Sequence, residues 1–148
     1  MKRTWRINWL IGFGLLAVVL VPLYWILWFA SPETIQTFAP GSPEYPAYVT
    51  FEQAFILADS WLAFSALIGV VGVLRMRRWG VLFMLLAGGS AIFLGLMDLL
   101  YDLQHSVFVP LTSEAAIELA IVGMLLGLGT CVIILSWGAL NDFQNEFN

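Results

Sequence analysis

The stretch that decides the fold is residues 79–103, WGVLFMLLAGGSAIFLGLMDLLYDL, which has no Lys or Arg and holds its only acids, Asp98 and Asp102, near its end. About 20 helical residues are enough to cross the roughly 30 Å apolar core of a bilayer. Apolar stretches of similar length lie at 7–29, 51–74 and 114–137. Each should be a helix, because no backbone polar group can go unpaired in lipid. The sequence therefore predicts an all-α polytopic membrane protein, one domain over residues 1–148, built as an up-down bundle of four transmembrane helices.

The composition favours the same class of protein. Hydrophobic residues make up 61% of the 148-residue chain and charged residues 11%, whereas charged residues make up about 25% of a typical soluble domain. The mean hydropathy is +0.90. These values exclude a soluble enzyme and a disordered tail. The formal net charge of −4 argues against a nucleic acid as partner, because binding phosphates takes a basic surface. The partner we expect is the lipid bilayer.

The basic residues predict the orientation of the bundle. All of them lie either at the N-terminus or in the link between the second and third spans, at Lys2, Arg3, Arg6, Arg75, Arg77 and Arg78. The loops at 30–50 and 104–113 contain no Lys or Arg. By the positive-inside rule, both termini and the short Arg link should face the cytoplasm. We expect a prokaryotic plasma (inner) membrane, with loop 30–50 on the outer side.

The first span is expected to remain in the protein rather than to be cleaved as a signal peptide. Its apolar run covers 23 residues, longer than the 7–15 residues of a signal peptide's apolar region. Small residues spaced four apart should let the helices pack closely in lipid. These rows are Ala54/Ala58, Ser65/Gly69, Ala87/Ala91/Gly95 and Gly123/Gly127. Five of the seven Trp residues lie near span ends and predict interfacial belts: Trp5, Trp9, Trp28, Trp79 and Trp137.

The acidic residues are placed as unevenly as the basic ones. Eight of the ten map to the outer half of the bundle: Glu33, Glu44, Glu52, Asp59, Asp98, Asp102, Glu114 and Glu118. Helical spacing puts acids on one face of each of the second, third and fourth spans. We therefore expect an acidic pocket near the outer face, built from these three spans and covered by loop 30–50. The candidate binding residues are Glu52, Asp59, Asp98, Tyr101, Asp102, His105 and Glu118.

The acids differ in how readily local structure explains them. Glu52 and Glu114 are expected in first helical turns, where the helix dipole stabilises a carboxylate. The dipole disfavours Asp98 and Asp102, which lie near the C-terminal end of their span. Asp59 lies about 12 Å inside its span at 1.5 Å per residue. An acid at mid-membrane costs about 2.5–3.5 kcal/mol, which makes it a functional candidate by default. The structural alternative is a hydrogen bond between spans.

Four functions are compatible with such a cluster. Asp98, Asp102 and His105 lie on one face and could ligate a divalent metal ion. An organic amine could pair with the acids while Trp25, Trp61 or Tyr101 contacts its body. Proton-coupled transport is a third function, and with only four spans it would require a homo-oligomer. An accessory or assembly subunit, whose polar residues hold helices together, is the fourth.

An enzyme that uses Asp59 or Asp98 as acid and base on a lipid-like substrate is a further alternative. The single histidine, His105, excludes haem with two axial histidines. The lone Cys131 excludes paired-cysteine redox chemistry. The sequence contains no P-loop and no dinucleotide-binding glycine motif, so we expect no nucleotide.

Two segments also carry a limited family resemblance. Residues 51–59, FEQAFILAD, and residues 93–104, FLGLMDLLYDLQ, are similar to segments of a group of small four-span prokaryotic membrane proteins, and the region of Glu118 is also similar. The resemblance covers the second to fourth spans. No activity is attached to that group, so the resemblance implies the architecture and no catalytic role.

Overall fold

The computed structural model describes residues 4–38 and 40–145, and the side chains of residues 33, 34 and 142–145 are outside this description. Every regular element in these residues is a helix, as expected from the sequence. In chain order they are α1 (Trp5–Ala30), α2 (Pro32–Ile35), α3 (Tyr45–Gln53), α4 (Ile56–Leu74), α5 (Arg78–Gln104) and α6 (Ser113–Asn145).

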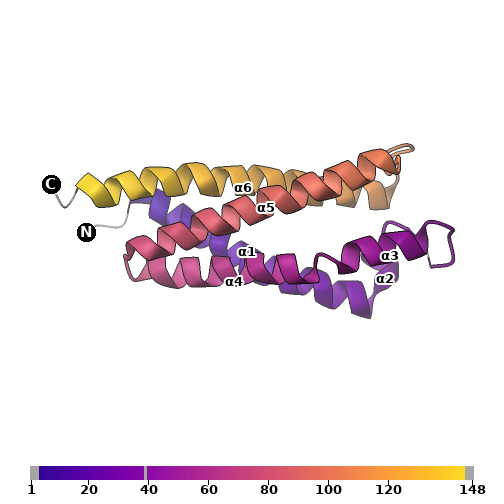
Figure 1. Cartoon of the computed structure of the whole chain (residues 1–148), viewed down its shortest axis with the longest axis horizontal. Helices are drawn as coiled ribbons and strands as arrows, with labels where there is room; N and C mark the ends of the chain where they lie inside the picture. Colours follow the sequence, from indigo (N-terminus) through magenta and orange to yellow (C-terminus); the bar gives the residue numbers. More distant parts are fainter. Residues whose placement is uncertain (1–3, 39, 146–148) are drawn as a thin grey trace.

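Four long apolar helical segments form the body of the bundle. Each is long and apolar enough to cross a membrane: Trp5–Ala30, Tyr45–Leu74, Arg78–Gln104 and Ser113–Asn141. They pack as a closed ring in which α1 lies on α4 and α6, and α5 lies on the same two helices. Successive segments run in opposite directions, so that α1 begins at the end of the bundle where α6 ends (Figure 1). This antiparallel arrangement is the up-down order that the short links predict.

The second span begins earlier than the sequence predicts, and it is interrupted. Helix α3 begins at Tyr45 with Pro46 in its first turn, a position that suits proline's fixed φ and missing N–H. Ala54 and Phe55 then separate α3 from α4. Their N–H groups donate to the carbonyls of Phe51 and Glu52 at 3.1 and 2.9 Å. The break therefore leaves these donors paired, as a membrane-embedded segment requires.

A tight turn joins α4 to α5 at the end where α1 begins. Met76 has a positive φ of 55°, and the N–H groups of Met76 and Arg77 donate back to the carbonyls of Val73 and Gly72. This is the Schellman arrangement, which pairs carbonyls that a helix end otherwise leaves free. The turn lets α5 begin at Arg78, so the two helices lie side by side from the start.

Close packing relies on glycines, but only partly on those that the four-residue spacing predicts. A Cβ on Gly80 would overlap the backbone of Gly72, where α4 and α5 meet. A Cβ on Gly88 would lie 3.0 Å from the carbonyl oxygen of Gly129, where α5 meets α6. Gly123 and Gly127, in contrast, are exposed and a Cβ there would meet nothing within 4 Å. The prediction that this last pair packs within the chain was wrong.

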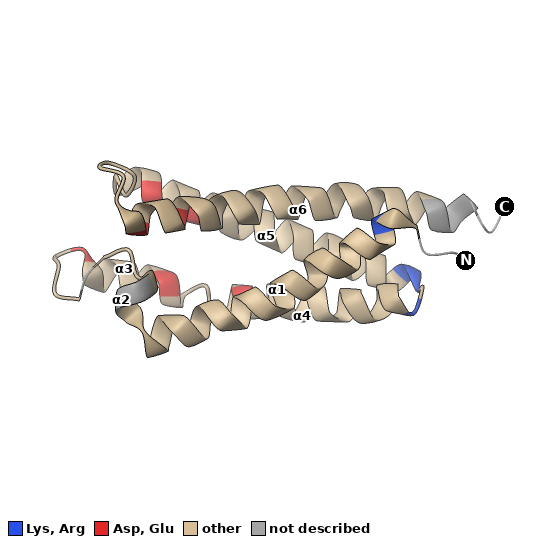
Figure 2. Ribbon diagram, turned by 180° about the vertical axis from the view of Figure 1, so that it is seen from behind, with Lys and Arg blue, Asp and Glu red and all other residues tan. Residues whose placement is uncertain are grey.

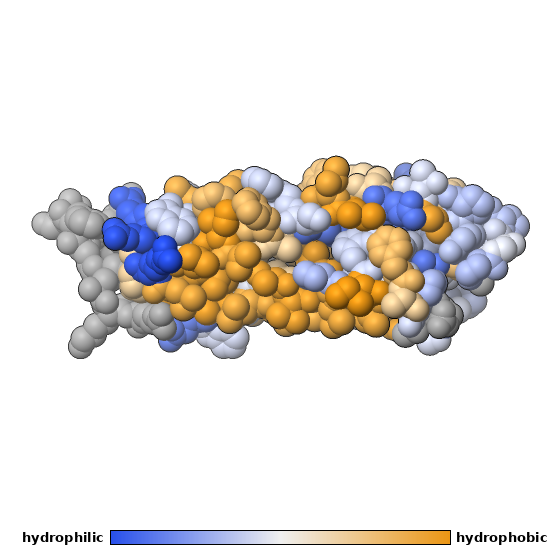
Figure 3. All heavy atoms as spheres, turned by 90° about the horizontal axis from the view of Figure 1, so that it is seen from below, coloured by the Kyte–Doolittle hydropathy of each residue, from blue (hydrophilic) through white to orange (hydrophobic). Residues whose placement is uncertain are grey.

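Charge and hydropathy divide the molecule along its length. The described Arg residues lie at the end where α1 begins, whereas acidic residues lie toward the opposite end (Figure 2). The face drawn in Figure 3 is apolar between hydrophilic ends. Trp5, Trp9, Trp79 and Trp137 are exposed near the Arg end. Trp28, predicted to join such a belt, is instead buried among aromatic rings. Lys2 and Arg3 lie outside the described residues.

Candidate ligand-binding cavity

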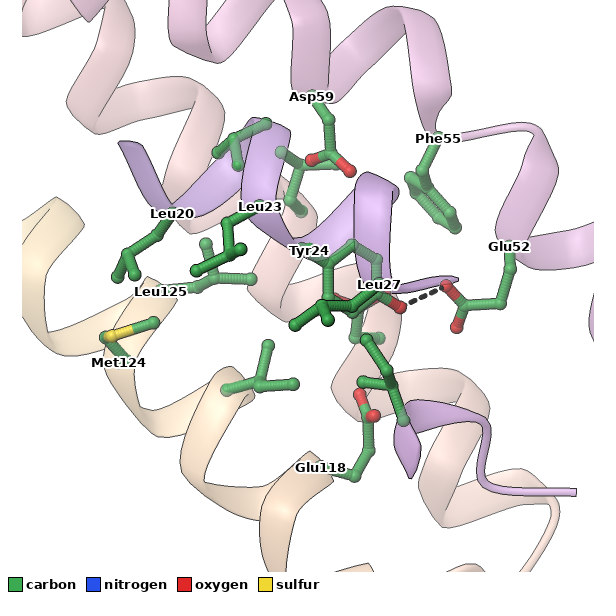
Figure 4. Close-up of a pocket in the computed structure, with 15 residues that line it drawn as sticks. Leu20, Leu23, Tyr24, Leu27, Glu52, Phe55, Asp59, Glu118, Met124 and Leu125 are labelled. Carbon is green, nitrogen blue, oxygen red and sulfur yellow. Dashed lines mark hydrogen bonds between the residues drawn. The ribbon is translucent and has the colours of Figure 1, made fainter. Parts of the chain in front are cut away.

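A cavity of about 240 Å³ lies in the half of the bundle away from the turn that joins α4 to α5. A single water needs only about 10–15 Å³, so this volume admits a small organic molecule. Four carboxylic side chains line it: Glu52 of α3, Asp59 of α4, Asp98 of α5 and Glu118 of α6. The rest of the lining is apolar or aromatic and comes largely from α1 and α6. Figure 4 shows side chains from α1, α3, α4 and α6 around this space.

Helix α1 supplies the hydrogen-bond donors for two of the carboxyl groups. The Tyr24 hydroxyl donates to Glu52 Oε2 at 3.0 Å, a contact drawn as the dashed line in Figure 4. The Trp25 indole N–H donates to Asp59 Oδ2 at 2.9 Å. Such bonds offset part of the cost of burying a polar group among apolar side chains. Adjacent aromatic residues of the first span therefore hold two acids of the second in place.

The other two carboxyl groups have no such partner. Among the residues that the structure describes, neither Asp98 nor Glu118 has a hydrogen bond to its side chain. Glu118 is only 6% exposed, and it lies below Tyr24 and Leu27 in the close-up, directed into the cavity (Figure 4). Glu52 is within electrostatic range of Glu118, Asp98 and Asp59. The cavity thus brings four carboxyl groups together, and two of them lack hydrogen-bond donors among the described residues.

The structure places three of the sequence-predicted residues outside this cavity. Tyr101 packs in an aromatic cluster with Trp28 and Tyr48, and its ring is stacked on Phe51 at 4.0 Å between centroids. Asp102 is buried behind it. His105 is exposed at the end of α5, where its Nδ1 lies 2.9 Å from the Tyr101 carbonyl oxygen. Four of the seven candidates therefore share one space, and these three do not line it.

The predicted metal ligands are not brought together. In the described part of the chain, no three His, Cys, Asp or Glu side chains are placed so that they could hold a metal ion. Asp98 lines the cavity, Asp102 is buried but does not line it, and His105 is exposed. The three residues share one helical face near the end of α5, but their side chains do not converge on one point.

The main contributor that sequence reasoning missed is α1. The cavity was expected between the second, third and fourth spans, yet Leu20, Val21, Leu23, Tyr24 and Leu27 form one of its walls. The signal was a Tyr–Trp pair inside an otherwise apolar run, since a buried hydroxyl or indole N–H usually has a partner. Of the residues of loop 30–50 that the structure describes, only Ile35 lines the cavity. Trp61, another aromatic candidate, is exposed elsewhere on α4.

Comparison with known proteins gives no family for this chain. No protein-family model, no curated protein and no solved structure matches it. The resemblance of residues 51–59 and 93–104 to small four-span prokaryotic proteins has no support from these comparisons. Function is therefore inferred from the geometry of the cavity.

Proposed function

We propose that this chain is an integral membrane protein that binds a small organic cation, an amine, in the cavity lined by Glu52, Asp59, Asp98 and Glu118. The observation that supports this most strongly is the environment of the Glu118 side chain. Glu118 is only 6% exposed, its carboxyl group is directed into the cavity, and it has no hydrogen-bond donor among the described residues. A buried carboxylate without a donor is costly, and an ammonium group supplies three donors together with the opposite charge.

Charge balance supports a cation in the cavity. Among the described residues, no basic side chain lines it, and all six Lys and Arg residues lie at the chain start or in the 75–78 turn. Carboxylates that share a low-dielectric space cannot all be ionised unless a cation joins them. A bound ammonium between Asp98 and Glu118 would meet the two acids that lack donors. The Tyr24 and Trp25 donors would continue to hold Glu52 and Asp59.

The apolar part of the lining supports an organic cation rather than a metal ion. The cavity is otherwise formed by residues such as Phe55, Leu94 and Ile121, which can contact hydrocarbon but cannot ligate an ion. Small-molecule sites combine a mostly apolar wall with a few placed polar groups. The cavity follows this pattern, with carboxylates as the polar groups.

The ligand's charge can be tested with two probes of nearly equal shape. Benzylamine carries an ammonium group, whereas benzyl alcohol carries a neutral hydroxyl. We expect the purified protein in neutral detergent to bind benzylamine about five- to tenfold more tightly, since hydrogen bonds to charged groups exceed neutral ones by about 1–1.5 kcal/mol. Isothermal titration calorimetry measures both. Equal affinities would contradict an electrostatic role for the carboxylates.

We also propose that the end of the bundle where α1 begins and α6 ends faces the cytoplasm of a prokaryotic cell. The support is the position of Arg6, Arg75, Arg77 and Arg78 at that end, together with the positive-inside rule. The cavity would then lie in the outer half of the membrane.

Cysteine labelling in intact cells checks this orientation. In a chain with Cys131→Ala, we expect Leu111→Cys to react with a membrane-impermeant maleimide and Arg77→Cys to react only after lysis. Leu111 and Arg77 are both exposed, at opposite ends of the bundle. The reverse pattern of labelling would show that the proposed orientation is inverted.

A further inference from the structure

A second cavity adjoins the carboxylate-lined one. It lies toward the end of the bundle where α4 turns into α5. It measures about 80 Å³ and shares four lining residues with the first: Leu20, Val21, Met124 and Leu125. Its remaining lining comes from α1, α4, α5 and α6 and reaches Phe13 on α1 and Val132 on α6. Among the described residues, no polar side chain lines it. A carboxyl-lined cavity thus adjoins a purely apolar one.

The two cavities are aligned along the seam between α1 and α6. On α6 their linings extend from Glu118 to Val132, which at 1.5 Å per residue is about 21 Å. The second cavity alone covers Phe13 to Val21 on α1, or about 12 Å. The charged end is toward the acidic end of the bundle and the apolar end is toward its middle. This is the order of headgroup and chain in one leaflet of a bilayer.

The seam also reaches the outside of the bundle. Leu23 is 43% exposed, Leu27 37% and Met124 36%, although all three line the carboxylate cavity. Leu16, which lines the apolar cavity, is 38% exposed. These side chains belong to α1 and α6, and they lie in the apolar length of the bundle. Their exposure indicates that both cavities are accessible from the hydrocarbon of the membrane rather than only from water.

We propose that the ligand is a single-chain amphiphile with an ammonium headgroup, which enters from the membrane between α1 and α6. The ammonium lies among the carboxylates, and the alkyl chain lies in the apolar cavity. This inference rests on the proposed amine binding and specifies the class of amine. Charge complementarity with Glu118 and Asp98 selects a cation, and the continuous apolar extension selects an attached hydrocarbon chain.

The test compares a short amine with a long one in variants that fill only the apolar cavity. Ala17 lines the apolar cavity and not the carboxylate one. We expect Ala17→Phe to weaken dodecylamine binding about tenfold or more, a loss of about 1.4 kcal/mol, because the ring takes up space that the alkyl chain would fill. Benzylamine binds among the carboxyl groups and lacks a long chain, so its affinity should change far less than that of dodecylamine. Retained benzylamine binding also shows that the variant is folded.

Two further variants complete the design. Leu16→Trp fills the same cavity from its exposed side and should act like Ala17→Phe. Gly12→Phe adds the same ring to α1 at a position where a Cβ meets nothing within 4 Å, and it should leave both affinities unchanged. Each variant is compared with the wild-type chain for the same ligand, so partition of the amine into detergent cancels.

The possible outcomes separate this inference from the proposed function. If both amines bind more tightly than benzyl alcohol but Ala17→Phe and Leu16→Trp leave dodecylamine unaffected, the amphiphile inference is overturned and amine binding stands. If neither amine binds more tightly than benzyl alcohol, the proposed function itself fails. Selective loss of dodecylamine binding in both filled variants supports the amphiphile.

Discussion

An Ile121→Lys variant is expected to lose benzylamine binding while the bundle stays folded. Ile121 lines the carboxylate cavity and lies one helical turn from Glu118 on α6, because residues three apart share a face. A Lys there would place its own ammonium among the carboxylates and occupy the position of the ligand. Charge pairs of this kind are worth about 2–5 kcal/mol, so affinity should fall at least about thirtyfold.

The melting temperature makes this prediction independent of misfolding. An unpaired buried Lys would strongly destabilise the bundle, whereas a Lys paired with the cavity carboxylates should leave the melting temperature equal to that of the wild type or above it. Ile121→Met, which keeps the apolar character and similar size, is the control and should retain benzylamine binding. A Lys variant that unfolds while the Met variant stays folded would show that the cavity does not accept a cation.

The four long helices were predictable because their cause is local. Each apolar run is long enough to span a bilayer. A chain in lipid must pair its backbone polar groups internally, and a helix does so. The boundaries of the second span were less predictable. In the sequence, Pro46 indicates a loop. In the structure it occupies the first turn of α3, so the helix begins at Tyr45. The break after Gln53 has no Gly or Pro in the sequence to mark it.

The residues that line the cavity were also predictable only in part. The cost of burying an acid identified Asp59 and Asp98, and both line it. The same helical spacing also selected Asp102 and His105, because spacing gives a shared face along α5 but not the depth of each residue. Asp102 is buried outside the lining of the cavity and His105 is exposed. The part played by Tyr24 depends on how α1 packs on α4, and no single helix encodes that.

Glu118→Gln has the second large expected effect, and it acts on the residue that carries the proposal. Glutamine keeps the shape of the side chain and removes its negative charge, so the shape of the cavity does not change. Loss of one partner of a buried charge pair costs about 2–5 kcal/mol, which predicts at least about thirtyfold weaker benzylamine binding. The bundle should remain folded or become more stable, because a buried carboxyl group without a donor is removed.

Glu114 provides the matched control on the same helix. It lies one turn before Glu118, is exposed, and accepts a hydrogen bond from Ser113 at 2.9 Å. Glu114→Gln removes the same charge from α6 outside the cavity. Its effect on benzylamine affinity should stay within about twofold, because exposed charges are screened by water and salt.

The dissociation constant of benzylamine, measured by calorimetry side by side for the wild-type chain, Glu118→Gln and Glu114→Gln, tests amine binding in the cavity most directly. We predict that it rises at least about thirtyfold for Glu118→Gln and stays near the wild-type value for Glu114→Gln. Equal dissociation constants in all three proteins, or equal losses in the two variants, would contradict amine binding by the carboxylates of this cavity.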